Sequence, residues 1–202
     1  MNCVDALKQE SLSLGFLASA FLLLPDKQLV RNLRDLPFAF AASSNEPGAL
    51  ELAAYAQSIQ GKTDDEVLRE LGTDRAKLIR HVDAQCINPP YESLYANEPE
   101  SDVVQSLNRL FIEAGFAPSG KYCEASDQIG MELSFMKFCV DREIEATLEE
   151  DEDAARAIAA IKDRFFDEHL GRWMASYGEA MRRSAQTGYY RAIADLLTSL
   201  SS

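Results

Sequence analysis

Three carboxylates gather around a predicted helix start between residues 124 and 132. Glu124 and Asp127 precede a segment in which apolar residues recur at helical spacing, and Glu132 falls in its second turn; the apolar residues are Ile129, Leu133, Met136 and Val140. Ser126 or Asp127 is the predicted N-cap, because its side-chain oxygen can accept the free amide hydrogens of the first turn. Such carboxylates either stabilise the helix start or pair with cationic groups of a ligand. The pattern alone leaves both interpretations open.

The helix that follows, over about residues 127–149, is apolar on more than one face. Beside the main apolar stripe it carries Met131, Phe135, Phe138 and Cys139. A helix that is apolar nearly all round packs on several sides, so this one is expected to run through the middle of the domain. Its acidic start is then expected to open at the surface, held rigidly by the core as a recognition site requires.

Nearly the whole chain has a helical pattern, and no alternating run is long enough to predict a strand. Thr63 and Glu66 form a predicted capping box, Gly61 is a predicted C-cap, and Asp74 is predicted to begin a new helix. The expected fold is all-α with about nine to ten helices. The other predicted helices cover about residues 4–24, 26–33, 46–60, 102–114, 152–170, 172–185 and 188–199.

A proline-containing stretch at residues 88–101 lacks a helical period and is the longest predicted loop. We treat residues 1–202 as one helical domain in which this loop joins an N-terminal lobe, about 1–87, to a C-terminal lobe, about 102–202. A domain of this length can bury a substantial core.

The composition of the 202-residue chain limits its partners. The net charge is −13, with 47% hydrophobic and 26% charged residues. Nucleic acids and anionic membranes are disfavoured, because their phosphates need clustered Lys and Arg, whereas a basic partner is favoured. The apolar run Leu12–Leu24 has only 13 residues, too short to cross a bilayer, so no stable membrane insertion is expected. The absence of a basic leader in Met1–Glu10 predicts a cytoplasmic protein.

The sequence contains no recognisable catalytic or metal-binding pattern. The four cysteines have no paired spacing and are expected to be free thiols, and no P-loop, GxGxxG or HExxH occurs. A carboxylate-bridged di-iron site needs Glu-x-x-His pairs, but Leu78 and Phe166 stand three residues before His81 and His169. His169, without an evident nucleophile, is expected to be structural. We therefore expect no enzyme, no cofactor and no metal site. A nucleotide-binding enzyme with Mg²⁺ at the acidic helix start is an alternative that lacks a phosphate cradle.

Four segments in order resemble the TorD/DmsD family of molybdoenzyme maturation chaperones. The pattern Glu-x-x-Asp-x-Ile-Gly-x-Glu-Leu-x-Phe-Met, starting at Glu124, is similar to the family signature. Here Ser126 and Gln128 stand where the family usually has Pro and His. The other three segments are Pro89–Tyr95, Phe166–Trp173 and Tyr189–Ala192.

The resemblance implies a cytoplasmic chaperone that binds the twin-arginine leader of a molybdopterin oxidoreductase, and possibly its body. Such a chaperone assists cofactor insertion before export. The polar residues implied to bind the leader are Glu124, Asp127, Gln128 and Glu132, and the implied apolar wall is Leu78, Ile79, Pro89, Pro90, Tyr91 and Tyr95. The alternative function is an assembly or delta-type subunit of a nitrate-reductase-like complex. The client enzyme is on another chain and cannot be identified from this one.

Overall fold

The computed structural model of the protein describes residues 3–36, 46–80, 86–96, 98–118 and 124–200. Within these ranges the chain forms helices joined by loops, and no strand is present beyond an isolated bridge between Tyr91 and Gln128. The predicted all-α class is therefore confirmed. His81 and Cys123 lie outside the described residues.

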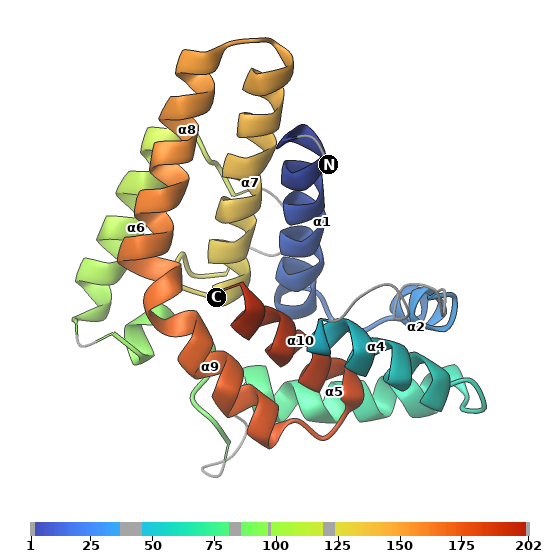
Figure 1. The fold of residues 1–202 in the computed structure, drawn as a ribbon. Helices are drawn as coiled ribbons and strands as arrows, with labels where there is room; N and C mark the ends of the chain where they lie inside the picture. The colour runs from blue at the N-terminus through green and yellow to red at the C-terminus, as the bar shows by residue number, and fades with distance from the viewer. Residues whose placement is uncertain (1–2, 37–45, 81–85, 97, 119–123, 201–202) are drawn as a thin grey trace. The chain divides into compact units, whose positions relative to one another are not determined.

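The helices follow one another in the order labelled in Figure 1. They are α1 (Cys3–Leu22), α2 (Lys27–Arg34), α4 (Pro47–Ser58), α5 (Asp64–Ile79), α6 (Glu100–Ala114), α7 (Ile129–Leu148), α8 (Glu152–Phe165), α9 (Gly171–Ser184) and α10 (Gly188–Ser199). A 3₁₀ turn, Glu92–Leu94, precedes α6, and a π turn, Phe166–Leu170, joins α8 to α9. The predicted helix over 152–170 is thus an α-helix that ends in a π turn.

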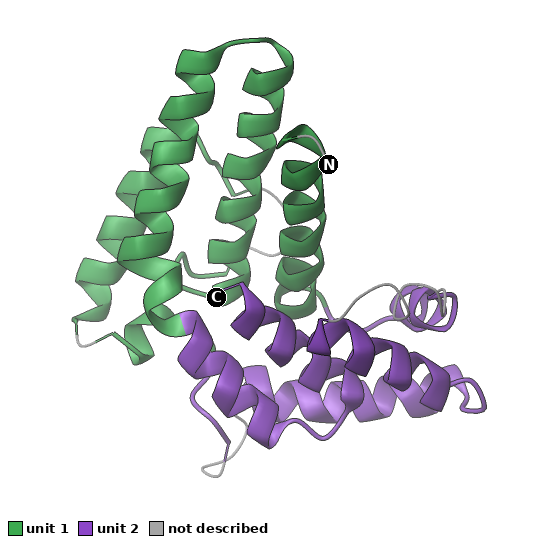
Figure 2. Ribbon diagram, viewed as in Figure 1, with its two compact units in different colours: residues 1–23, 90–173 green, residues 24–89, 174–202 purple. Residues whose placement is uncertain are grey.

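The chain divides into two compact units, each assembled from two separate stretches of sequence (Figure 2). Unit 1 consists of Met1–Leu23 and Pro90–Trp173, and unit 2 of Leu24–Pro89 and Met174–Ser202. The predicted division into consecutive lobes, 1–87 and 102–202, is not confirmed. A hydrophobic periodicity shows which face of a helix is buried, but not which distant helix covers it.

Helix α7 forms the centre of unit 1, as its apolar faces predicted. It packs along both α1 and α8 (Figure 1). Phe135 of α7 is fully buried, with its ring centroid 4.7 Å from that of Phe111 on α6 and 4.8 Å from that of Phe165 on α8. Aromatic rings at these separations add to the stabilisation that their burial gives. The position of the first turn of α7 is therefore fixed by the core behind it.

Helix α10 of unit 2 packs on α4 and α5. Its first residue, Gly188, allows the close approach to α4, because a Cβ atom there would lie 2.9 Å from the Cβ of Tyr55. Helix α5 runs unbroken through Asp74, so the predicted helix start at Asp74 is wrong. The buried Asp74 carboxylate instead accepts hydrogen bonds from the backbone N–H groups of Gln186 and Thr187, at 3.0 and 2.7 Å. It thereby satisfies amide groups at the start of a helix distant in sequence.

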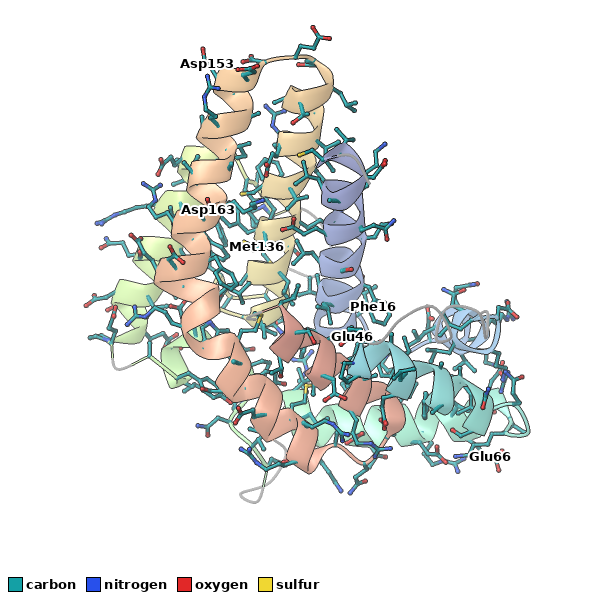
Figure 3. All side chains as sticks on the ribbon, in the orientation of Figure 1. Phe16, Glu46, Glu66, Met136, Asp153 and Asp163 are labelled. Carbon is teal, nitrogen blue, oxygen red and sulfur yellow. The ribbon has the colours of Figure 1, made fainter. Side chains whose placement is uncertain are left out.

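Local capping signals were predicted with mixed success. The capping box of Thr63 and Glu66 is confirmed; Glu66 is labelled in Figure 3. The predicted C-cap at Gly61 is wrong, because α4 ends at Ser58 and Ile59 is its C-cap. The predicted N-cap of α7 is also wrong: Gln128 occupies that position, and its side-chain oxygen accepts the Gly130 N–H at 2.6 Å.

Three cysteines lie in the described part of the chain, and all are free thiols: Cys3, Cys86 and Cys139. Burial raises the pKa of Cys139 to about 12. This thiol is therefore kept protonated, and it is a poor nucleophile because the thiolate is the reactive form.

Among the described helices, none combines the length and the apolar character that crossing a membrane requires.

We predict that Asp74→Ala destabilises the protein by about 2–4 kcal/mol, because several hydrogen bonds to one buried carboxylate are lost together. Besides the two amides, the Thr187 hydroxyl donates to Asp74 at 2.7 Å. Chemical denaturation followed by circular dichroism measures the change. The exposed Asp163→Ala on α8 serves as control and should change stability by less than about 0.5 kcal/mol. Equal effects of the two substitutions would contradict the role of Asp74 as a hydrogen-bond acceptor for Gln186 and Thr187.

Candidate functional site

Three carboxylates converge at the start of α7 in unit 1. Asp127 and Glu132 belong to the segment singled out by its sequence, and Glu92 comes from the 3₁₀ turn. Their exposed fractions are 1%, 0% and 2%, in that order. We call Glu92, Asp127 and Glu132 the carboxylate cluster. The expectation that the acidic start of this helix opens at the surface was wrong for Asp127 and Glu132.

Backbone hydrogen bonds hold the 3₁₀ turn against the start of α7. The Ile129 N–H donates to the carbonyl of Pro90 at 2.9 Å, and the Glu92 N–H donates to the carbonyl of Asp127 at 2.8 Å. These bonds form beside the isolated bridge of Tyr91 and Gln128. The chain therefore brings together two segments that the sequence analysis had noticed separately.

The Asp127 side chain reinforces the same junction. One carboxylate oxygen, Oδ2, accepts the Ser93 hydroxyl at 2.6 Å. The Asp127 carboxylate therefore does not cap α7. It holds the 3₁₀ turn against the start of the helix. No local sequence pattern indicates this role, since the two residues are 34 positions apart.

His169 joins the carboxylate cluster through the π turn. Its Nδ1 lies 3.0 Å from both carboxylate oxygens of Glu92, and its Nε2 lies 3.0 Å from the hydroxyl oxygen of Ser106. No nucleophile near His169 is evident in the sequence, but the fold places the Ser106 hydroxyl within hydrogen-bond distance of its ring. Both ring nitrogens are hydrogen-bonded in a buried site, as a structural histidine requires. Gly171 permits the π turn, because a Cβ there would lie 2.7 Å from the Phe166 carbonyl oxygen.

Trp173 adjoins Glu132 and stacks on a second aromatic residue, Tyr95. The Trp173 indole N–H donates to Glu132 Oε2 at 3.3 Å. The half-buried Tyr95 ring stacks on Trp173, with ring centroids 5.3 Å apart and an interplanar angle of 29°. The Glu132 carboxyl is therefore enclosed on this side by aromatic surface that leads from the interior to the partly exposed Tyr95.

The pKa of Glu132 is raised well above its usual value. Burial is the largest cause, and the neighbouring Glu92 charge adds to it, while the hydrogen bond from Trp173 acts in the opposite direction. A carboxyl that is desolvated beside other carboxylates favours its neutral form. Glu132 is therefore poised to give up a proton when a cation approaches.

Two oxygens of the cluster lack a hydrogen-bond partner among the described residues. They are Oδ1 of Asp127 and Oε1 of Glu132, and both atoms are buried. Buried polar atoms in folded proteins are nearly always hydrogen-bonded, so such atoms call for an explanation. Chemically, the pair can accept hydrogen bonds from a cationic donor such as a guanidinium group. In the described part of the chain, no three His, Cys, Asp or Glu residues are arranged to hold a metal ion.

The remaining predicted site residues are divided between the units. Pro90 is buried in unit 1, whereas Glu124 and Tyr91 are half-buried there. Leu78, Ile79 and Pro89 belong to unit 2, where Leu78 and Ile79 are buried. The structure therefore brings together Asp127, Gln128, Glu132, Pro90, Tyr91 and Tyr95, all within unit 1. The predicted contacts of all these residues with a ligand are untested.

Glu92, His169 and Trp173 were not predicted from the sequence as members of this site. All three stood in segments that carried the family resemblance, which was the available signal. Their spacing could not reveal the site, because Glu92 and His169 are 77 positions apart.

We predict that Glu132→Gln removes a pH-dependent loss of stability. The raised pKa means that the folded wild type binds more protons than the unfolded chain, so it loses stability as the pH rises from the ordinary Glu pKa through the raised one. Gln resembles the neutral acid at every pH. Thermal melting should show the variant close to the wild type near pH 4 and more stable than it at pH 8. The exposed Glu168→Gln is the control, and a variant that paralleled the wild type across this range would contradict the assignment.

Comparison with known proteins places the chain in a family. The model of the nitrate reductase delta subunit family matches residues 42–177, more than half of the chain. A relative named Chaperone protein TorD, from Photobacterium profundum, is 29% identical over 111 residues, which cover 54% of this chain and 50% of the relative. A protein of the same name from Escherichia coli strain K12 is 25% identical over 163 residues, covering 78% of this chain and 74% of the relative.

The chain thus spans about half the length of the Photobacterium relative that it matches. The family match covers the 3₁₀ turn, all of α7 and the π turn, and so includes every member of the carboxylate cluster. These findings confirm the resemblance to the TorD/DmsD chaperones that the sequence motifs indicated. The protein belongs to the nitrate reductase delta subunit family.

Proposed function

We propose that this protein is a cytoplasmic maturation chaperone for a molybdopterin oxidoreductase. It binds the twin-arginine leader of the enzyme, and the enzyme body as well, until the cofactor is inserted. Membership in the family and the similarity to proteins named as chaperones support this function. The chaperone itself performs no chemical step.

The observation that carries the proposal is the pair of buried acceptor oxygens on Asp127 and Glu132. A leader arginine offers five N–H donors in a planar fork that matches carboxylate oxygens. Because these oxygens are buried, a guanidinium that reached them would form charge-assisted hydrogen bonds in a poorly hydrated site. Glu132 would release its proton as the cation enters, so binding of the leader becomes more favourable at higher pH.

The leader reaches the cluster through the 3₁₀ turn. In the structure the Ser93 hydroxyl and the Asp127 carboxylate close this turn onto α7. Glu124 is more exposed than Asp127 and makes the first contact with the leader arginines, after which the turn moves and exposes the cluster. Gln128 fixes the first turn of α7 and supports the site without contributing charge.

The apolar part of the leader packs on Pro90, Tyr91 and Tyr95 in unit 1. Tyr91 and Tyr95 are half-buried, so each presents part of its ring at the surface. Leu78, Ile79 and Pro89 of unit 2 are included in the proposal as further apolar contacts, and Leu78 and Ile79 must first become exposed.

The alternative function is an assembly subunit that stays with its oxidoreductase; it belongs to the same matched family, and the match does not favour it over the chaperone. Co-purification distinguishes the two functions. A chaperone leaves the mature enzyme, whereas a subunit remains in stable stoichiometry with it.

We predict that a synthetic twin-arginine leader peptide binds the protein and that salt weakens the binding. Exposed charges are screened beyond about 8 Å at ~0.15 M ionic strength, so the first encounter with an acidic protein is salt-sensitive. A matched peptide with both arginines replaced by glutamine should bind more weakly in a titration followed by fluorescence anisotropy. Equal affinities of the two peptides would contradict the proposed binding of the leader arginines.

We predict that Asp127→Asn and Ser93→Ala have different effects on leader binding. Asp127→Asn keeps an oxygen that can accept the Ser93 hydroxyl but removes the charge, so affinity should fall by about tenfold to a hundredfold. Ser93→Ala keeps the charge and loosens the turn, so affinity should be retained or increased. Melting temperatures of both variants control for folding. If Asp127→Asn bound the peptide normally, Asp127 would be a structural residue alone.

A further inference from the structure

Trp173 is placed so that a cation stacked on its ring would lie beside the carboxylate cluster. The indole N–H donates to Glu132 Oε2 at 3.3 Å. Because this N–H points outward in the plane of the ring, the Glu132 carboxyl lies at the edge of the indole. The other carboxyl oxygen, Oε1, is buried without a hydrogen-bond partner among the described residues, as is Oδ1 of Asp127. A donor group on the ring face would therefore be close to an unused acceptor.

Tyr95 occupies a face of the indole in the structure. The two ring centroids lie 5.3 Å apart, with an interplanar angle of 29°. Trp173 is only 2% exposed, whereas Tyr95 is half-buried and presents part of its ring at the surface. The Tyr95 ring therefore separates this face of the indole from solvent.

Tyr95 belongs to the part of the site that moves in the proposed function. It is the C-cap residue of the 3₁₀ turn, and its N–H donates to the Glu92 carbonyl at 2.8 Å. Trp173 lies instead in the first turn of α9. A turn that moves away from α7 therefore carries the Tyr95 ring away from the indole. Stacking of two rings is a modest interaction, which a stronger contact can replace.

A guanidinium group fits the uncovered indole face better than an ammonium group does. The guanidinium is planar, so it can stack on a ring while its N–H donors still point outward to carboxylates. An ammonium is a compact and strongly hydrated charge, which must direct some of its donors at the ring. Tryptophan is the best aromatic partner for a cation, and the contact is stronger in a desolvated site. An indole face with carboxyl oxygens at its edge therefore favours arginine over lysine.

The basic residues beside Trp173 are engaged with other partners. Nη1 of the exposed Arg172 lies 3.3 Å from the Glu98 carboxylate and 3.2 Å from the Glu168 carbonyl oxygen. The ring of His169 faces Glu92 on one side and the Ser106 hydroxyl on the other. A guanidinium that stacks on this indole would therefore come from a ligand.

We propose that Trp173 selects arginine over lysine in the leader, and that Tyr95 occupies the place of the arginine guanidinium until the leader binds. The guanidinium stacks on the indole face and donates to Glu132 and Asp127, whereas an ammonium gains too little from the ring to displace Tyr95. This inference rests on the proposed binding of a twin-arginine leader. It goes further by assigning the residues that distinguish arginine from lysine.

The first test titrates the full chain with leader peptides that differ only in the twin residues, which are Arg-Arg, Lys-Lys or Gln-Gln. The first two peptides carry the same charge, so a difference between their affinities does not arise from net charge. We expect the Arg-Arg peptide to bind about tenfold more tightly than the Lys-Lys peptide in fluorescence anisotropy.

The three peptides separate the failure of this inference from the failure of the proposed function. Equal affinities for the Arg-Arg and Lys-Lys peptides would overturn the inference, and the proposed function would stand if the Gln-Gln peptide bound more weakly. A wild-type protein that did not bind the Arg-Arg peptide would refute both.

Substitution of Tyr95 tests whether its ring must leave. Tyr95→Ala removes the ring, and Tyr95→Phe keeps one and is the matched control. The preference for Arg-Arg over Lys-Lys should rise about three- to tenfold in Tyr95→Ala and stay within about twofold of the wild type in Tyr95→Phe. The contact of Tyr95 with the apolar part of the leader is common to both peptides, so it cancels in this ratio. An unchanged or lower preference in Tyr95→Ala would contradict the displacement.

Substitution of Trp173 tests the indole face itself. Trp173→Phe and Trp173→Leu both remove the N–H that Glu132 accepts, but only Phe keeps an aromatic face. Trp173→Phe should retain a preference for the Arg-Arg peptide, whereas Trp173→Leu should bind the two peptides within about twofold of each other. Melting temperatures verify that both variants fold. The same preference in both variants would exclude Trp173 as the selecting residue.

The fluorescence of Trp173 provides a test without any substitution, because it is the one tryptophan of the chain. Unlabelled peptides that lack Trp and Tyr are added to the wild type until binding is saturated. The Arg-Arg peptide should change the emission of Trp173 more than the Lys-Lys peptide does, because a stacked ring is exchanged for a cation. Saturation by the Arg-Arg peptide with unchanged emission, or equal changes with both peptides, would overturn the proposal.

Discussion

The burial of carboxyl groups at the start of α7 is the constraint on which the organisation of unit 1 depends. An isolated carboxylate is too costly to bury, so it must be paired, hydrogen-bonded or protonated. Glu92 is paired with His169, Asp127 accepts the Ser93 hydroxyl, and Glu132 has a raised pKa. Meeting these demands brings the 3₁₀ turn and the π turn to the first turn of the central helix.

Much of the fold was predictable because local signals agree with the tertiary structure. The all-α class, α10 and the Thr63–Glu66 capping box follow from periodicity and short-range capping patterns. The wrong predictions concern side chains that form hydrogen bonds with residues distant in the sequence. Asp74 has the residue type of a helix start, yet it lies within α5 and accepts the backbone N–H of Thr187, the N-cap residue of α10. Likewise, Asp127 was predicted to cap its own helix, but it binds Ser93.

The sequence by itself determined the family, the helical class and the acidic segment that contains Asp127 and Glu132, because motifs and periodicity are local. Only the tertiary structure decided that these carboxylates are buried, that Glu92 and His169 join them, and that each unit combines distant segments. Burial depends on which helices cover a residue, and residues tens of positions apart meet through packing that no local pattern encodes. The protonation preference of Glu132 follows from that burial, so it too was decided by the fold.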